Sequence, residues 1–403
     1  MKYVDEFRDP VVGRRVIDRI ARTTEAYVRR ERRTRPIKLM EVCGGHTHAI
    51  FKFGLDEVLP DAIELVHGPG CPVCVLPVGR VDDALHIATQ PGVIFTTFGD
   101  ALRVPGSRRS LLQAKAEGAD IRTVYSPADA LALARETPDR DVVFFGLGFE
   151  TTVPSTALTV KQARAEGIEN FFLFSNHITI IPTIKAILDA PDLDLDGFLG
   201  PGHVTMVIGM KPYQFICDTY RKPFVVSGFE PLDVLQSIAM VMDQLHAGQC
   251  AVENQYRRLV PDEGNAVAMR AVADVFRLRD HFEWRGLGSI EHSGLELNDA
   301  YADFDAERRY AVPALSVADP KACQCGEVLQ GKLKPWECKV FGTGCKPETP
   351  IGSCMVSSEG ACAAYYTHGR ISTLRARTTA PSPTRSHDDL VVLPPRRRAS
   401  GAE

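Results

Sequence analysis

Short apolar runs rich in β-branched and aromatic residues recur from residue 37 to about residue 230. Each run is followed by a glycine-rich or polar turn and then by a stretch with helical spacing. Strands that alternate with helices predict a parallel sheet, in which functional loops follow the carboxyl ends of the strands. The predicted strands are Ile37–Val42, Ile63–Val66, Val93–Phe98, Ile121–Tyr125, Val142–Phe145, Phe171–Phe174, Gly197–Leu199 and Phe224–Val226.

The predicted strands divide into two sets of four, and each set contains one Gly-Pro-Gly turn, at residues 68–70 and 200–202. This repetition predicts an α/β fold of two similar lobes, each a parallel sheet flanked by helices. We expect the first lobe to span residues 1–137 and the second to span residues 138–248. A helix ahead of the first strand is expected to pack on the first lobe, with Asp9 as its N-cap and Pro10 at its first position.

Residues 249–370 are predicted to form a helical segment followed by a cysteine-rich region, because residues 230–310 have mainly helical spacing. The cysteine-rich region has many Gly and Pro residues and few large apolar side chains, so burial alone would not order it. A bound metal centre would supply the missing free energy. Residues 371–403 are rich in Ser, Thr, Pro and Arg and predict a disordered basic tail.

Composition limits the classes of binding partner and the cellular compartment that we expect for this chain. The chain has 403 residues and a formal net charge of -4, which gives no electrostatic reason to expect nucleic acid or an anionic membrane as a partner. The N-terminal residues lack a signal-peptide pattern, and no apolar run approaches the ~20 residues that a membrane span needs. We therefore expect a cytoplasmic protein. In that reducing compartment, eleven cysteines indicate metal binding or redox chemistry rather than a disulfide framework.

The first cysteine motif is Cys43-Gly44-Gly45-His46, which follows the first predicted strand directly. Two glycines allow the backbone to approach a ligand closely, and the N-terminus of the following helix favours a thiolate at Cys43. His46 is a candidate second metal ligand or acid/base group. The alternative is an unreactive buried cysteine beside a tight turn, but the two histidines at His46 and His48 favour the functional interpretation.

The second motif is Cys71-Pro72-Val73-Cys74, directly after the second predicted strand. Two cysteines at this spacing at the start of a helix can close a small disulfide or bind a metal, because the helix N-terminus lowers the thiol pKa. Structural zinc would need four ligands, and no second such pair follows in the usual window. The motif therefore predicts a redox-active pair.

The third group lies in the C-terminal region. Its spacing from Cys325 to Cys362 is C-x12-C-x6-C-x16-C when Cys354 is skipped, which matches neither a ferredoxin nor a zinc-finger pattern. Four thiolates without a well-placed histidine favour an iron-sulfur cluster or a zinc site, and the spacing does not choose between them. The cysteines of this group are Cys323, Cys325, Cys338, Cys345, Cys354 and Cys362.

Further polar turns at predicted strand ends contain Asp100, Glu150, His177 and His203. Their ordinary role is helix capping and turn formation, and their functional alternative is a position in the same cleft as the cysteines. The turn at residues 146–152 departs from the dinucleotide-binding fingerprint at its third glycine, and the chain has no phosphate-binding P-loop motif. Nucleotide binding is therefore not expected.

These motifs, in this order, resemble the HypD family of NiFe hydrogenase maturation proteins. The resemblance implies a complex with a HypC-type small chaperone, cyanide from a HypE-type donor, and assembly of an Fe(CN)2CO group before delivery to the hydrogenase large subunit. The segments that carry it span nearly all of residues 38–370 and are MEVCGGHTHAIFKFG, HGPGCPVCVLP, TFGDALRVPGS, GFETTVPSTA, SNH, GPGHVTMVIG, NQYRRLVPDEGN and CQCGEVLQGKLKPWECKVFGTGCKPETPIGSCMVSSEGACAAYY.

The resemblance also implies roles for individual residues. Cys43 would bind the iron, with His46 beside it, and Cys71 with Cys74 would be the redox-active pair. The family carries a 4Fe–4S cluster in its C-terminal part, which favours iron-sulfur over zinc. The expected cluster ligands are Cys325, Cys338, Cys345 and Cys362, with Cys323 and Cys354 as alternatives.

Two other functions use part of the same motifs. A cluster-dependent thiol-disulfide oxidoreductase would use the Cys71/Cys74 pair and the cluster, but it leaves Cys43 and His46 without a role. A zinc-stabilised scaffold would have no redox function. The favoured prediction is a scaffold for metallocentre assembly that has redox activity, rather than a conventional turnover enzyme.

Overall fold

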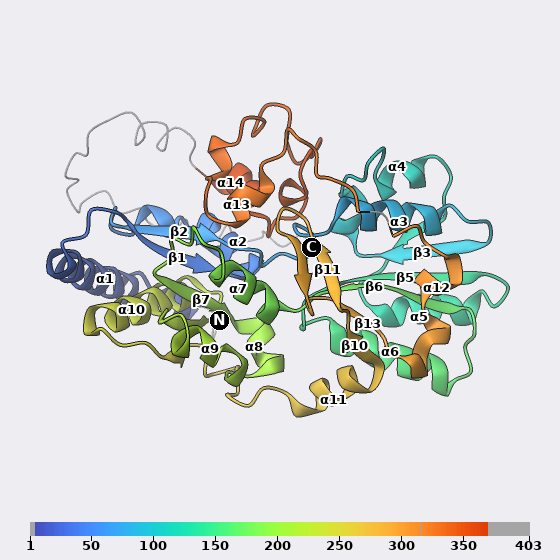
Figure 1. The fold of residues 1–403 in the computed structure, drawn as a ribbon, viewed down its shortest axis with the longest axis horizontal. Helices are drawn as coiled ribbons and strands as arrows, with labels where there is room; N and C mark the ends of the chain where they lie inside the picture. The colour runs from blue at the N-terminus through green and yellow to red at the C-terminus, as the bar shows by residue number, and fades with distance from the viewer. Residues whose placement is uncertain (1–4, 315, 370–403) are drawn as a thin grey trace, which may run out of the picture.

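The computed structural model describes residues 5–314 and 316–369, so the predicted disordered tail at 371–403 lies outside the described residues. Two parallel sheets lie at opposite ends of an elongated molecule (Figure 1). The five-stranded sheet has the order β2 (Ile63–His67), β1 (Ile37–Glu41), β7 (Gly197–Pro201), β8 (Phe224–Ser227), β9 (Val252–Asn254). The four-stranded sheet has the order β4 (Ile121–Thr123), β3 (Val93–Thr97), β5 (Asp141–Gly148), β6 (Phe171–His177).

All eight predicted strands are confirmed, but the predicted division into contiguous lobes at residue 137 is wrong. Strand β1 pairs with both β2 and β7, so the four-stranded sheet is inserted between two parts of the five-stranded one. Both Gly-Pro-Gly turns belong to the same sheet, since the first directly follows β2 and the second spans the end of β7. Local periodicity predicts strands well, but it carries no information about which distant strand completes a sheet.

Helices cover the faces of both sheets, as the strand–helix alternation predicts. The N-terminal helix is confirmed, with the Asp9 carboxylate accepting hydrogen bonds from the Val11 and Val12 amides, and it packs along α10. The helices are α1 (Pro10–Glu31), α2 (Gly44–Phe53), α3 (Val78–Ala88), α4 (Leu111–Ala116), α5 (Pro127–Glu136), α6 (Val153–Ala165), α7 (Ile180–Leu188), α8 (Gly202–Ile208), α9 (Gln214–Asp218), α10 (Pro231–Ala247), α11 (Ala266–Val275), α12 (Ala306–Tyr310), α13 (Cys325–Leu329) and α14 (Ala361–His368). Short 3-10 helices are η1 (Asp5–Arg8), η2 (Leu55–Glu57), η3 (Gly99–Arg103), η4 (Lys211–Tyr213), η5 (Asp299–Phe304), η6 (Pro335–Glu337) and η7 (Ser353–Met355).

The prediction that residues 230–310 are mainly helical holds for α10, α11, η5 and α12 but is wrong for the segments between them. This part of the chain also contains β9 and two antiparallel strand pairs. Strand β10 (Phe276–Leu278) pairs with β13 (Leu295–Leu297), and β11 (His281–Trp284) pairs with β12 (Gly288–Glu291). These strands are only three or four residues long, too short for a period of two to be distinguished from a helical pattern.

Each sheet contains a point where the strand order reverses, between β1 and β7 in one and between β3 and β5 in the other. Ligands of open α/β sheets bind in the crevice beyond the carboxyl ends of the strands at such a point. Cys43 follows β1, and the glycine-rich turn that contains Glu150 follows β5. The topology alone therefore places these two turns where binding sites form.

The cysteine-rich region carries α13 and α14 and lies above the junction of the two sheets (Figure 1). Helix α14 packs on α2, and the Arg103 guanidinium of η3 donates to the backbone carbonyls of Pro347 and Val356. The region therefore contacts elements that follow strands of both sheets. Its iron-sulfur character stays a prediction.

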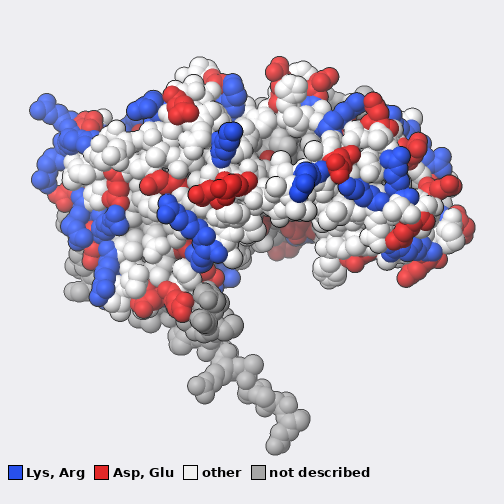
Figure 2. All heavy atoms as spheres, turned by 90° about the horizontal axis from the view of Figure 1, so that it is seen from below, with Lys and Arg blue, Asp and Glu red and all other residues white. Residues whose placement is uncertain are grey.

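Basic and acidic side chains alternate over the face seen in Figure 2, without a continuous basic surface on that face. This distribution agrees with the absence of an electrostatic argument for nucleic acid. Within residues 5–314 and 316–369, none of the helices combines the length and the apolarity needed to cross a bilayer.

Candidate functional site

The Cys43 turn begins where β1 ends. Cys43 has an extended conformation and stands at the N-cap of α2, with its carbonyl accepting from the His46 amide at 2.8 Å. A side chain could not replace either glycine without displacement of neighbouring atoms. A Cβ atom on Gly44 would lie 2.6 Å from Cβ of Glu359, and one on Gly45 would lie 2.8 Å from the Phe229 ring. The two predicted glycines therefore allow close packing around Cys43.

The buried carboxylate of Glu41 holds the main chain of this turn in place. Oε2 of Glu41 accepts a hydrogen bond from the Cys43 amide at 3.0 Å, and Oε1 lies 2.9 Å from Nδ1 of His67. The hydroxyl of Thr47 also donates to Oε1. Glu41 and His67 are paired at the ends of β1 and β2, so strand register brings them together. A fully buried carboxylate needs this many partners, and the network fixes the main chain of Cys43.

His46 is fully buried next to Cys43 and has one ring nitrogen available. Nε2 lies 3.2 Å from the carbonyl oxygen of Ser227, which can only accept, so Nε2 carries the proton in that contact. Nδ1 has no hydrogen-bond partner among the described residues. Burial lowers the pKa of His46, which keeps the ring neutral and the Nδ1 lone pair free. This arrangement fits a metal ligand.

Phe229 stacks between two histidines beside the Cys43 turn. Its ring centroid lies 4.6 Å from that of His46 and 3.9 Å from that of His203, with nearly parallel planes in both pairs. His203 is the exposed member of this stack. The ring of Phe229 therefore places His203 close to His46.

The predicted preference of Cys43 for the thiolate is wrong for the metal-free thiol. The pKa of Cys43 is raised well above its ordinary value, first because the site excludes water and second because the Glu359 carboxylate is close. Hydrogen bonds from the Gly45 and His46 amides act in the opposite direction but do not compensate. A cation that binds Cys43 must therefore displace its proton.

The Cys71/Cys74 turn packs directly against the Cys43 turn. A Cβ atom on Gly70 would lie only 2.2 Å from the Cys43 nitrogen, and the Gly44 amide donates to the Gly70 carbonyl at 3.1 Å. Cys71 and Cys74 form a buried disulfide. Their expected place at the start of a helix is wrong, because α3 begins only at Val78.

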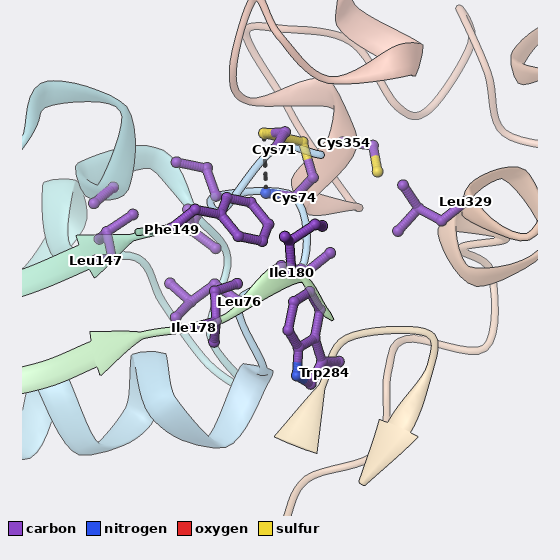
Figure 3. Close-up of a cluster of buried hydrophobic side chains, with 14 of the residues drawn as sticks. Cys71, Cys74, Leu76, Leu147, Phe149, Ile178, Ile180, Trp284, Leu329 and Cys354 are labelled. Atoms are coloured by element: carbon purple, nitrogen blue, oxygen red, sulfur yellow. Dashed lines mark hydrogen bonds between the residues drawn. A yellow bond between two sulfur atoms is a disulfide. The ribbon is translucent and has the colours of Figure 1, made fainter. Parts of the chain in front are cut away.

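Side chains that lie on or after strands of the four-stranded sheet, and side chains of the C-terminal region, lie around this disulfide (Figure 3). Phe149 and Ile178 follow strands of the four-stranded sheet, and Cys354 lies on the other side of Cys74. A Cβ atom on Gly360 would lie 2.9 Å from Sγ of Cys74 and 2.2 Å from the carbonyl oxygen of Cys354. The three distant stretches of cysteines therefore converge in one place.

Five cysteines of the C-terminal region line one small cavity, and Cys354 is not among them. Cys323 and Cys325 have their sulfur atoms 2.9 Å apart, and Cys325 also interacts with the thiol of Cys354. Among residues 5–314 and 316–369, no three histidine, cysteine or carboxylate side chains already have the arrangement of a metal site. The cysteines that line the cavity are Cys323, Cys325, Cys338, Cys345 and Cys362.

The other polar residues predicted at strand ends differ in their surroundings, and only one of them remains a candidate functional residue. His177 is buried between Thr156 and Ser175, and burial lowers its pKa to about 3, so it is a core histidine. Asp100 forms an exposed ion pair with Arg103. Glu150 differs, because Oε1 accepts from the Ile180 amide while its buried Oε2 has no partner among the described residues. Burial raises the pKa of Glu150 to about 7.

Sequence reasoning missed Glu41, His67, Phe229 and Glu359. One signal was present for Glu41, which is an acidic residue at the end of the apolar run that forms β1. Such a residue has to find polar partners when the strand is buried. Phe229 and Glu359 gave no comparable signal, since their proximity to Cys43 depends on contacts across more than 180 residues of chain.

Comparison with known proteins shows the family of this chain. The profile of the HypD family, described as the hydrogenase formation hypA family, matches residues 15–369. The chain belongs to the HypD family. Hydrogenase maturation factor HypD of Rhodobacter capsulatus is 56% identical over 373 residues, covering 92% of this chain and 98% of the relative.

Two further relatives carry the same name. Hydrogenase maturation factor HypD of Escherichia coli strain K12 is 56% identical, with 91% of this chain and 98% of the relative covered. The corresponding protein of Cupriavidus necator is 49% identical, with 92% of this chain and 98% of the relative covered. The family predicted from the order of the motifs is therefore confirmed.

We predict that Gly70→Ala destabilises this HypD-family protein by about 2–3 kcal/mol, because the added methyl group would overlap the Cys43 main chain. Urea unfolding followed by circular dichroism measures the effect. Gly99→Ala is the control, since its methyl group would meet only the Thr123 side chain, at 3.7 Å. Equal midpoints for the two variants would show that the contact between the turns does not constrain the fold.

We also predict a pH-dependent effect of Glu150→Gln. The folded pKa is about 7 and the ordinary value is 4.5, so ionisation increasingly destabilises the wild-type fold as the pH rises through this interval. The stability of the variant relative to wild type should therefore increase by about 3 kcal/mol between pH 4.5 and pH 8. Urea titrations at a series of pH values test this, with the exposed Glu169→Gln as baseline. Parallel profiles for Glu150→Gln and wild type contradict it.

Proposed function

We propose that this chain is a cytoplasmic maturation factor for NiFe hydrogenases and serves as the scaffold on which the Fe(CN)2CO group is assembled. Family membership and the names of the relatives support the general role. The observation that carries the specific role is the convergence of the Cys43 turn, the Cys71/Cys74 turn and residues 353–360. Three sulfur-bearing segments around one junction suit a site that holds iron and moves electrons.

Cys43 holds the incoming iron, which is the cargo of the reaction. A thiolate is a soft, electron-donating ligand, which iron needs when it also binds cyanide and carbon monoxide. The unpartnered Nδ1 of the neutral His46 ring supports its role as a second ligand. Glu41 fixes the Cys43 amide, and the proton displaced from Cys43 has the nearby Glu359 carboxylate as a possible acceptor.

Cys71 and Cys74 supply reducing equivalents to this site. Their disulfide accepts two electrons and two protons to become a dithiol, and it returns them when the sulfur–sulfur bond re-forms. The close main-chain contact between Gly70 and Cys43 supports transfer over a short distance. Both cysteines are buried, which protects the dithiol from oxidants in solution.

The C-terminal cavity fits a 4Fe–4S cluster in its donor set, because five thiol side chains and no histidine line it. Cys325, Cys338, Cys345 and Cys362 are the proposed ligands, with Cys323 as an alternative. When bound there, the cluster would supply single electrons. Cys354 does not line the cavity, but its thiol interacts with that of Cys325, so it stays an alternative ligand beside Cys323.

We propose the partners that the resemblance to the HypD family implies. A HypC-type small chaperone would share the iron, a HypE-type protein would donate cyanide, and the hydrogenase large subunit would receive the product indirectly. The exposed ring of His203, stacked on Phe229, marks the side from which the Cys43 turn can be approached. A thiol-disulfide oxidoreductase would explain the Cys71/Cys74 pair but not the His46 ring held beside Cys43, so it is the less favoured function.

We predict that Cys43→Ala abolishes the infrared bands of iron-bound cyanide and carbon monoxide in protein purified anaerobically with its small chaperone. The physical reason is loss of the thiolate that holds the iron. The brown chromophore of the cluster should remain, because Cys43 does not line the C-terminal cavity. Cys250→Ala is the control and should keep the bands. Retention of the bands in Cys43→Ala refutes the iron-holding role.

We further predict that Cys338→Ala removes the cluster absorbance and destabilises the C-terminal region, because a thiolate ligand is lost. Iron and acid-labile sulfide analysis measures the loss. The matched control is Cys250→Ala, which should keep both iron and sulfide because Cys250 precedes β9 in the five-stranded sheet and does not line the cavity. Full iron and sulfide content in Cys338→Ala would remove Cys338 from the ligand set.

A further inference from the structure

Two cysteines lie outside all three groups and close to each other. Cys217 belongs to α9, and Cys250 precedes β9, the edge strand of the five-stranded sheet. The Cys217 thiol donates to the Lys222 carbonyl at 3.2 Å, and burial together with the neighbouring Cys250 thiol raises the pKa of Cys217. Cys217 is 3% exposed, whereas Cys250 is half-buried.

The main chain holds these two cysteines together independently of their thiols. The Phe224 amide donates to the carbonyl of Ala251, the residue after Cys250, at 3.3 Å. On the other side, the Arg221 amide donates to the Cys217 carbonyl at 3.2 Å, and the Cys217 thiol donates to the carbonyl of Lys222, two residues before Phe224. Strands β8 and β9 pair from Phe224 and Val252 onward, and α9 packs against β9. Both cysteines are therefore anchored around the start of β8.

We propose that Cys217 and Cys250 form a site of reversible oxidation, at which a low-molecular-weight disulfide such as glutathione disulfide converts the two thiols into an intramolecular disulfide. The site is separate from the Cys43, Cys71/Cys74 and C-terminal groups. The proposal therefore does not rest on the proposed function.

The different exposure of the two thiols assigns their roles. Cys250 is accessible, so its thiolate attacks the glutathione disulfide and releases one glutathione thiolate. Cys217 then loses its proton to solvent, attacks the Cys250 sulfur of the mixed disulfide and releases the second glutathione. The two protein thiols are oxidised by two electrons in total, and one glutathione disulfide is reduced to two glutathione molecules.

The new bond would join α9 to the edge of the sheet. Strand β9 is hydrogen-bonded to a strand on one side only, and edge strands open locally more readily than central ones. A covalent link immediately before Val252 would restrain that opening. Oxidation should therefore slow amide hydrogen exchange in residues 252–254.

Peptide mapping by mass spectrometry tests the proposal on the full-length protein. Anaerobically reduced protein is incubated with glutathione disulfide, its free thiols are alkylated, and the digest is searched for a peptide pair joined through Cys217 and Cys250. We expect this pair in wild type and its loss on treatment with dithiothreitol. Hydrogen exchange of residues 252–254 should be at least several-fold slower in the oxidised sample than in the reduced one.

Two single variants separate the roles of the thiols. Cys217→Ser should accumulate glutathione on Cys250, because the resolving thiol is absent, whereas Cys250→Ser should leave Cys217 unmodified. Neither variant should show slower exchange in residues 252–254 after oxidation. Wild-type protein that retains both thiols free, or that carries glutathione on Cys250 without forming the joined pair, would overturn the proposal.

Discussion

The organisation of this protein depends on one main-chain contact, in which Gly70 lies against the backbone of Cys43. Only a residue without a side chain permits such an approach, so the two turns can share a boundary without intervening atoms. The buried Glu41 carboxylate, which holds both the Cys43 amide and His67, secures the same junction from within the sheet. The iron and redox chemistry proposed for this place would require that these two turns remain in contact.

Much of the fold could be predicted because it is locally encoded. Every strand from β1 to β8 was visible as an apolar run, and the start of α1 was visible from Asp9 and Pro10. Sheet membership was not predictable, since β1 completes its sheet with β7, more than 150 residues further along the chain. The short strands β10 to β13 were missed because three or four residues do not establish a period.

Part of the candidate site could likewise be predicted from the sequence, and part could not. The sequence predicted that the Cys43 and Cys71/Cys74 motifs lie close together, because each directly follows a strand and parallel strands end on one side of a sheet. It could not distinguish His177, whose ring nitrogens are satisfied, from Glu150, whose Oε2 is not. It also predicted the wrong acidity for Cys43, because desolvation and the Glu359 charge come from residues distant in sequence.

The position of the Cys71/Cys74 pair along the chain has a mechanical consequence. The segment from Gly68 to Pro77 joins β2 of one sheet to α3 and β3 of the other, so it is one of the covalent links between the two halves of the molecule. Closing a ring between Cys71 and Cys74 restricts the backbone torsions of that link, and opening the ring releases them. In the redox role proposed for these sulfurs, reduction would therefore remove a restraint on one of the connections between the two sheets.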